Sequence, residues 1–177
     1  MTHSHLEVFL KRATRWSSVL LAVSTAGVVA VAGPADAAPA KYTHSQAKAL
    51  LDKAGIRVSS SGNCSNVNNP RCTSLQGINR TTVSGLIRFK RISKCSNITV
   101  TGGTERGVHA KGPYGHEAGY KIDISRTPCV TGFVNKNFKR AGQRKDGTRL
   151  FRSMNKNVYA DERSRNHWDI LYYNGSA

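Results

Sequence analysis

Apolar and polar positions along the chain predict two helices followed by a series of strands. A helix is predicted over residues 43–56, because an apolar stripe at helical spacing follows a threonine and a glutamine arranged as a capping box. A second helix is predicted within residues 73–93, where four apolar positions approximate one buried face: Val83, Leu86, Ile87 and Phe89. A short third helix is predicted at residues 132–142.

Strands are predicted where apolar and polar residues alternate instead. The segments with this pattern are residues 97–103, 120–125, 145–153, 157–162 and 167–173. Because the helices come first and the strands mainly follow, the order favours an α+β fold. We expect N-terminal helices packed on a small antiparallel sheet, in a single domain.

The first 37 residues have the pattern of a secretory signal peptide. A basic stretch precedes an apolar run that ends in the small-residue sequence Ala-Asp-Ala at 35–37. Residues 1–37 are therefore predicted to be removed on secretion, and residues 38–177 to form the mature domain. A membrane anchor is the alternative, and it is disfavoured because the apolar run is short for a span.

The four cysteines are expected to form two disulfides, because an even number of cysteines in an exported chain is typical of a disulfide framework. Pairing Cys64 with Cys72 and Cys95 with Cys129 is preferred, since it closes one local loop and joins two later elements. The sequence does not fix this pairing. A zinc site made of all four cysteines is the alternative, but the chain has no Cys-x-x-Cys pair.

The charge of the chain is strongly positive, with a formal net charge of +17 from 27 basic and 10 acidic residues. The predicted signal peptide holds three of the basic and two of the acidic residues, so the mature chain stays strongly basic. A secreted protein of this charge is expected to adhere to polyanions such as anionic cell-wall polymer. Charge alone does not distinguish such a polymer from nucleic acid or an acidic surface.

The stretch 112–125 combines a histidine and an acidic residue, which are both scarce in this chain, around a glycine. In the strand predicted from residue 120, Asp123 points to the face opposite the apolar residues. Gly119 permits a tight turn, so His116 on the preceding loop is expected to fold back over that face. An imidazole and a carboxylate held in this way can bind one metal ion, which needs a third ligand.

The third ligand is predicted to be His167. If residues 163–166 form a hairpin loop, Glu162 and His167 are direct cross-strand partners, with Cβ atoms about 5 Å apart. A carboxylate beside a metal-binding histidine is placed to act as a general base, so Glu162 is the predicted catalytic residue. Asp161 would point to the opposite face and is the less favoured alternative. Two histidines and one carboxylate form a catalytic type of zinc site, so we expect one Zn²⁺ per chain.

The pattern His116-x-x-Gly119-x-x-x-Asp123, followed later by His167 and a tryptophan, resembles the zinc D-alanyl-D-alanine peptidase family. That family includes carboxypeptidases and phage endolysins that cut the stem peptides of peptidoglycan. The resemblance covers roughly residues 97–170. It implies that the two histidines and the aspartate are zinc ligands.

The chain departs from this family's pattern at three positions. Lys121 stands where the family usually has alanine, and Tyr114 stands where a serine is frequent. The family's acidic base usually lies three residues before the last histidine, where this chain has Ser164, whereas Glu162 lies five before it. Arg106 is the nearest candidate for the family's substrate-orienting arginine, and the substrate-binding residues are otherwise unassigned.

The resemblance implies a secreted zinc-dependent peptidase that cleaves an amide bond in a peptidoglycan stem peptide. The activity would be that of a D-Ala-D-Ala carboxypeptidase or of a cross-link endopeptidase. We expect a monomer that is extracellular or associated with the cell wall and that has no specific nucleic-acid partner. Two alternatives stay open: a basic, disulfide-stapled wall-binding or antimicrobial protein without catalysis, and a secreted metal-dependent nuclease.

Overall fold

The computed structural model describes residues 41–173, which lie within the second of the two compact units of the chain, Ala38–Ala177. The predicted signal peptide, residues 1–37, lies outside the described residues. In the described part of the chain, no helix is long and apolar enough to cross a membrane.

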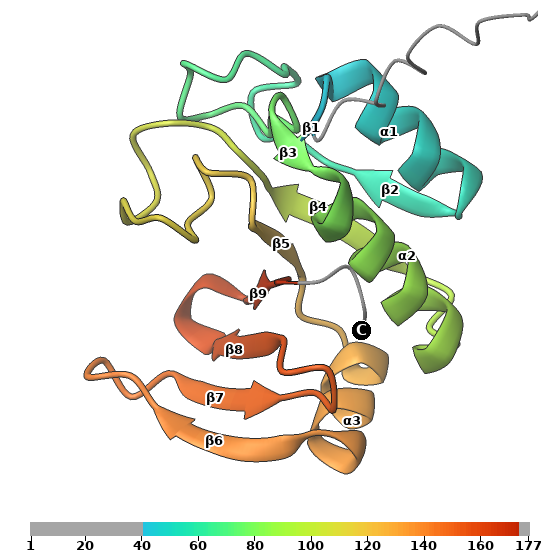
Figure 1. Ribbon diagram of the computed structural model, residues 1–177, viewed down its shortest axis with the longest axis vertical. Helices are drawn as coiled ribbons and strands as arrows, with labels where there is room; N and C mark the ends of the chain where they lie inside the picture. Colours follow the sequence, from blue (N-terminus) through green and yellow to red (C-terminus); the bar gives the residue numbers. More distant parts are fainter. Residues whose placement is uncertain (1–40, 174–177) are drawn as a thin grey trace, which may run out of the picture. The chain divides into compact units, whose positions relative to one another are not determined.

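Three α-helices are present in the described residues: α1 (His44–Lys53), α2 (Arg80–Ser93) and α3 (Pro128–Asn137) (Figure 1). The predicted capping box of α1 is confirmed. The Thr43 hydroxyl accepts a hydrogen bond from the Gln46 backbone, and the Gln46 side chain accepts one from the Thr43 backbone. These bonds fix the start of the helix by satisfying two N–H groups that lack partners inside it.

Several helix boundaries differ from the prediction: α1 and α3 end earlier than predicted, at Lys53 and Asn137, and the starts of α2 and α3 also differ. Helix α2 begins only at Arg80, because the preceding residues form a loop and a short strand, and its N-cap is Asn79. Helix α3 begins four residues before its predicted start, where the Thr127 hydroxyl accepts a hydrogen bond from the Val130 backbone. Pro128 fits the first turn of α3, since that position needs no backbone donor.

Nine strands are present in the described residues: β1 (Lys41–Tyr42), β2 (Ile56–Val58), β3 (Ile78–Asn79), β4 (Ile98–Gly102), β5 (Lys121–Ser125), β6 (Lys139–Gln143), β7 (Arg149–Arg152), β8 (Val158–Glu162) and β9 (His167–Leu171). Strands β1 and β3 form a small antiparallel sheet. The other seven form one sheet in the order β2-β4-β5-β9-β8-β7-β6 (Figure 1).

The α+β class is confirmed, but the prediction of a small, wholly antiparallel sheet is wrong. Strand β2 pairs parallel to β4, because the intervening segment, which includes α2, returns the chain in the same direction. The order of helices first and strands later is also wrong, since β1 precedes α1, and β2 and β3 precede α2. The sheet is therefore mixed, and the remaining pairs are antiparallel.

The two faces of the central strands have different surroundings. Ile122 and Ile124 of β5 are fully buried, and their register partners on β9 are Ile170 and Trp168. These side chains share one hydrophobic core with residues of all three helices: Ala47, Leu51, Val83, Leu86, Phe89, Val130 and Val134. Because side chains alternate along a strand, the polar residues between them point to the opposite face.

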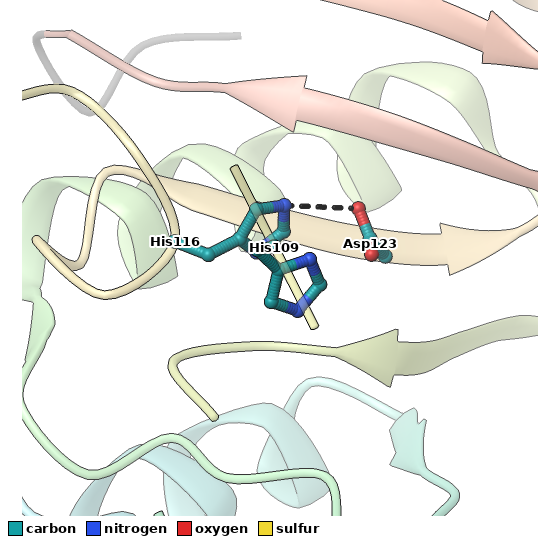
Figure 2. Close-up of side chains that lie close together, drawn as sticks. All are labelled: His109, His116 and Asp123. Carbon is teal, nitrogen blue, oxygen red and sulfur yellow. Dashed lines mark ion pairs between the residues drawn. The ribbon is translucent and has the colours of Figure 1, made fainter. Parts of the chain in front are cut away.

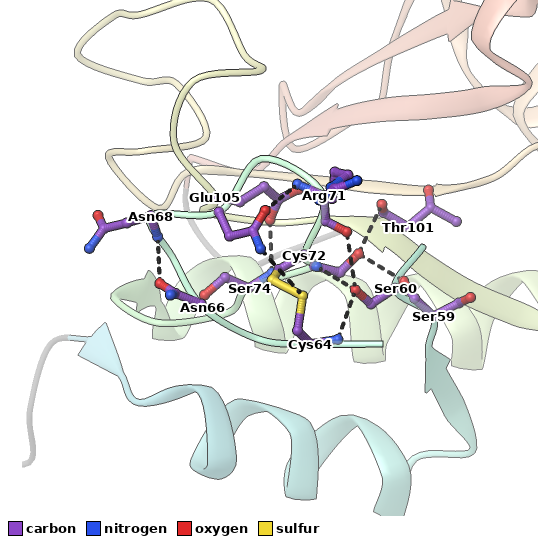
Figure 3. The surroundings of a disulfide bond; sticks show 12 residues. Ser59, Ser60, Cys64, Asn66, Asn68, Arg71, Cys72, Ser74, Thr101 and Glu105 are labelled. Atoms are coloured by element: carbon purple, nitrogen blue, oxygen red, sulfur yellow. Dashed lines mark hydrogen bonds between the residues drawn. A yellow bond between two sulfur atoms is a disulfide. The ribbon is translucent and has the colours of Figure 1, made fainter. Parts of the chain in front are cut away.

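The predicted disulfide pairing is confirmed, with Cys64 joined to Cys72 and Cys95 joined to Cys129. All four cysteines are therefore bound in disulfides, and the alternative of a four-cysteine zinc site is excluded. The first disulfide, Cys64–Cys72, closes a polar loop (Figure 3). Directly after this loop, the Thr73 hydroxyl donates to backbone carbonyls of β4 and of the segment after β2.

The two disulfides are expected to differ in their effect on stability. In the chain-entropy description, a cross-link stabilises more when it closes a longer loop. The sequence separation is 34 residues for Cys95–Cys129 and 8 residues for Cys64–Cys72. Replacing Cys95 and Cys129 by alanine should lower the free energy of unfolding by about 3–4 kcal/mol, and replacing Cys64 and Cys72 by about 2–3 kcal/mol. Urea denaturation of the two double variants measures this order, and equal losses would contradict it.

Strand β6 forms one edge of the seven-stranded sheet and pairs only with β7. Every residue of this strand is exposed, including Lys139 and Arg140. The opposite edge is the short strand β2. The sheet thus ends on one side in a solvated, basic strand.

Candidate functional site

Three adjacent strands, β5, β9 and β8, place acidic residues and a histidine on the face of the sheet away from the helices. Asp123 of β5 is the register partner of Asp169 of β9. On the other side of β9, His167 is the register partner of Glu162 of β8. The predicted cross-strand pairing of Glu162 with His167 is therefore confirmed. Sheet register alone brings these four side chains onto one surface.

The loop before β5 adds His116 to this surface. Gly119 turns the chain with a φ of +85°, and a Cβ atom there would lie 2.5 Å from the Gly77 carbonyl oxygen, so only glycine fits. His116 is buried, and its ring folds back as predicted. Its Nδ1 lies 2.7 Å from the Gly103 carbonyl oxygen, and its Nε2 lies 3.3 Å from Asp123 Oδ1.

The two oxygens of Asp123 face two different histidines. Oδ1 faces His116, is buried and has no hydrogen-bond partner. Oδ2 lies 3.8 Å from His167 Nε2. Atoms bound to one tetrahedral zinc ion lie about 3.3 Å apart, because each is about 2.0 Å from the ion. The spacing on the His116 side therefore matches a metal site, and the spacing from the other oxygen to His167 is about half an ångström wider. His116, Asp123 and His167 do not form a group among the described residues whose ligand atoms all lie within 4.8 Å of one another.

The pair formed by Glu162 and His167 is held by a hydrogen bond of 2.9 Å between Glu162 Oε2 and His167 Nε2. Arg144 also donates to Glu162. The hydrogen bond from His167 and that from Arg144 lower the pKa of Glu162 to about 2, although partial burial acts in the opposite direction. His167 can offer Nε2 to a metal ion only if it gives up its bond to Glu162.

Asp161, the alternative base, lies on the core side of β8. Its register partner is the buried Trp168, and its two oxygens are held by Arg126, Arg149 and Arg163. Its carboxylate is therefore fully used in ion pairs on that face. The expectation that Asp161 points away from Glu162 agrees with the structure.

Burial disfavours the charged form of His116, but the nearby Asp123 and Asp169 carboxylates outweigh this and raise the pKa of His116 to about 10. Without a metal ion, a proton on His116 thus supplies the positive charge between the two carboxylates. A metal ion in this position would replace that proton.

Asp169 and Arg144 were not identified from the sequence as residues of this site, and Lys121 was not predicted to act as a cation there. Asp169 is buried, and its Oδ2 accepts hydrogen bonds of 2.7 Å from both Lys121 and Arg144. Arg144 follows β6 and reaches Asp169 and Glu162 together. The alternation of β9 could have revealed Asp169, since it lies two residues after His167 and therefore on the same face.

His109 stacks on the His116 ring and contacts a buried carboxylate, so it is part of the site. The rings of His109 and His116 stack with centroids 3.6 Å apart and planes 11° apart. His109, His116 and Asp123 each offer a ligand atom within 4.8 Å of the others, so this group could hold a metal ion (Figure 2). The nitrogen lone pairs lie in the ring planes, however, so two parallel stacked rings do not converge on one ion without a rotation.

Glu105 contacts the stacked His109 ring and fixes its position. Its carboxylate is buried and accepts hydrogen bonds from the backbone N–H groups of Ser74 and Gly103, at 2.8 and 3.0 Å. His109 Nε2 lies 3.2 Å from the same carboxylate. Ser74 follows the loop closed by the first disulfide, so that loop supports one wall of the site (Figure 3).

A cavity of about 450 Å³ opens over these side chains. Its lining combines the four residues predicted for the catalytic site, His116, Asp123, Glu162 and His167, with Asp169, His109 and three cationic side chains, Lys121, Arg144 and Arg165. Arg106 does not line this cavity; its guanidinium donates to Asn68 instead. Lys121 and Arg144 both contact Asp169, and Arg144 also contacts Glu162.

Gly102 leaves the space that the Asp123 carboxylate occupies. The two residues are register partners on β4 and β5, and a Cβ atom on Gly102 would lie 2.5 Å from Asp123 Oδ2. Gly102→Ala should therefore displace this carboxylate and weaken metal binding at least about tenfold, an effect comparable to the loss of a group that orients a ligand. Zinc affinity measured by chelator competition tests this, with Gly132→Ala on α3, where a Cβ meets nothing, as the control. Equal affinities would contradict it.

Compared with known proteins, the chain matches no family model, no curated protein and no solved structure.

Proposed function

We propose that this protein is a secreted, zinc-dependent peptidase that cleaves an amide bond in peptidoglycan stem peptides. The observation that carries the proposal is that one cavity brings the pair His116 and Asp123 together with the pair Glu162 and His167, which comes later in the sequence. Two imidazoles, one carboxylate and an adjacent second carboxylate are the components of a catalytic zinc site. In this proposal His116, Asp123 and His167 bind the ion.

The donor set fits zinc on three counts. Asp123 Oδ1 is a buried carboxylate oxygen without a hydrogen-bond partner, which is costly unless a cation binds it. Its distance of 3.3 Å from His116 Nε2 equals the separation of two zinc-bound atoms. The other nitrogen of His116 is fixed by the Gly103 carbonyl, as the second ring nitrogen of a metal-binding histidine usually is.

When bound, zinc would supply a Lewis acid that polarises the scissile carbonyl and acidifies a water molecule. Glu162, beside His167, is placed to accept a proton from that water and to pass it to the leaving nitrogen. Binding of His167 to the ion would remove the hydrogen bond that contributes most to the lowered pKa of Glu162, which would make this carboxylate a stronger base than in the metal-free site. Arg144 is placed to stabilise negative charge that develops on the carbonyl oxygen.

The cavity lining, the net charge and the disulfides each support a wall peptide as the substrate. The cationic lining, Lys121, Arg144 and Arg165, complements the carboxylates of a stem peptide. The net charge of +17 favours adhesion to an anionic wall, which would raise the local concentration of substrate. The two disulfides suit an oxidising extracellular environment.

The test combines metal content and peptide cleavage on one preparation of residues 38–177 with both disulfides formed. Zinc per chain is measured by elemental analysis, and stem-peptide products are followed by mass spectrometry. About one zinc per chain together with chelator-sensitive release of D-alanine, or cleavage of a cross-link, would support the proposal, and the product masses would identify the bond. A folded chain that forms no products after zinc is supplied would overturn it and favour a basic wall-binding protein.

A further inference from the structure

Asp123 and Asp169 face each other across adjacent antiparallel strands. They are register partners on β5 and β9, so their Cβ atoms are separated by about 4.5–5.5 Å. Both residues are almost fully buried, at 3% and 5% exposure. In each of them Oδ1 is buried and has no hydrogen-bond partner.

Two facing carboxylates with unpaired buried oxygens are an expensive arrangement. Like charges directly opposite each other on a sheet are destabilising, and a buried charged oxygen without a partner costs more than a neutral one. The two Oδ1 atoms lie 3.3 and 3.5 Å from the same atom, His116 Nε2. Both unpaired oxygens therefore border one small region next to the imidazole.

We propose that Asp169 is a further metal ligand, whose Oδ1 binds the same divalent cation as His116 and Asp123. This inference rests on the proposed function only in taking that site to hold an ion. The cation would replace the proton of His116 as the positive charge between the two facing carboxylates and would bind both Oδ1 atoms, which have no hydrogen-bond partner. The donor set becomes two imidazoles and two carboxylates, and a catalytic water would then be a fifth ligand, a coordination number that catalytic zinc sites can reach.

The surroundings of Asp169 hold its side chain in the orientation that this role needs. Lys121 and Arg144 both donate to Oδ2, at 2.7 Å each, and leave Oδ1 free. Ligating carboxylates are commonly oriented by hydrogen bonds to their second oxygen. A carboxylate that served only to anchor these two cations would not also need its other oxygen turned toward His116 Nε2, which lies 3.5 Å away.

A second carboxylate also changes which ions the site prefers. Carboxylate oxygens suit manganese and other hard cations better than imidazoles do. With two carboxylates the site should bind Mn²⁺ measurably as well as Zn²⁺, and loss of Asp169 should weaken Mn²⁺ binding more than Zn²⁺ binding. The relative loss is therefore a readout that a purely structural role would not produce.

The test is metal affinity of the Asp169→Asn variant, measured by chelator competition with Zn²⁺ and by titration with Mn²⁺. This substitution keeps the side-chain shape and removes the charge. We expect at least about a tenfold loss of zinc affinity and a larger loss for manganese. Asp146→Asn is the matched control, since Asp146 lines the same cavity and its carboxylate accepts from the Thr148 backbone. The control should bind both metals as the wild type does.

Unchanged affinity of Asp169→Asn for both metals would overturn the inference, as would a wild-type chain that binds neither metal. If the variant does not fold, a crystal structure of the wild type with zinc decides instead. Asp169 Oδ1 should then lie about 2.0–2.2 Å from the ion, and a gap beyond about 3 Å would overturn the inference. Cleavage is scored separately, so a chain that binds metal through Asp169 without cutting peptides would refute only the proposed function.

Discussion

Replacing Glu162 by glutamine is expected to lower peptide turnover by about 10²–10⁴-fold, the usual contribution of a general base. The amide keeps the size of the side chain but cannot accept the proton. Zinc content should stay at about one per chain, because Glu162 is not among the proposed ligands. The measurement is the initial rate of stem-peptide cleavage at saturating zinc, together with elemental analysis of the same sample.

The control for this experiment is Ser164→Ala. Ser164 occupies the position three residues before His167 where the resembled family has its base, and it also lines the cavity. A hydroxyl there should contribute little, so this variant should keep turnover within a few-fold of the wild type. Near-normal turnover of Glu162→Gln would refute the assigned base.

Replacing Glu105 by leucine is expected to lower the free energy of unfolding by about 2–6 kcal/mol. The leucine would leave the N–H groups of Ser74 and Gly103 without an acceptor, and each buried unsatisfied donor costs about 1–3 kcal/mol. It would also release His109 from its position against the His116 ring, so zinc affinity should fall as well. Urea denaturation and chelator competition measure the two effects.

Glu105→Gln separates charge from hydrogen bonding. Its amide oxygen still accepts one backbone bond, so it should lose less stability than the leucine variant. Burial raises the pKa of Glu105, but hydrogen bonds from His109 and the backbone outweigh it and lower the pKa below its usual value of 4.5. The charge therefore stabilises the folded state above pH 4.5 and loses this effect as the pH falls through the lowered pKa. A stability difference between wild type and Glu105→Gln that grew in acid would contradict this.

The parts of the fold that were predicted from the sequence are those with a strong local signal. The capping box of α1, the alternation of β5 and the turn before β7 each involve few neighbouring residues. The short strands β2 and β3 gave no such signal, because their pairing partners come from distant parts of the chain. Residues 139–142 were predicted to be the end of a helix, but they lie in β6, which pairs with β7. The parallel pairing of β2 with β4 also joins segments that are far apart in the sequence, so it was not predicted.

The site follows the same division. His116 and Glu162 were placed correctly because a glycine turn and a hairpin register are local. Asp169 was missed, since its importance depends on the pairing of β5 with β9. Arg144 and Glu105 were missed because neither has a recognisable spacing; the first reaches the site from the β6–β7 connection and the second from a loop.

The exposed edge strand β6 has a consequence for the behaviour of the protein in concentrated solution. An unpaired strand edge is a template on which a second chain can add by backbone hydrogen bonding. Here that edge carries Lys139 and Arg140, and its residues are all solvated. Two copies approaching edge to edge would bring their like charges together, so the sheet resists growth into oligomers or fibres. Added polyanion would remove this protection by neutralising the lysine and arginine.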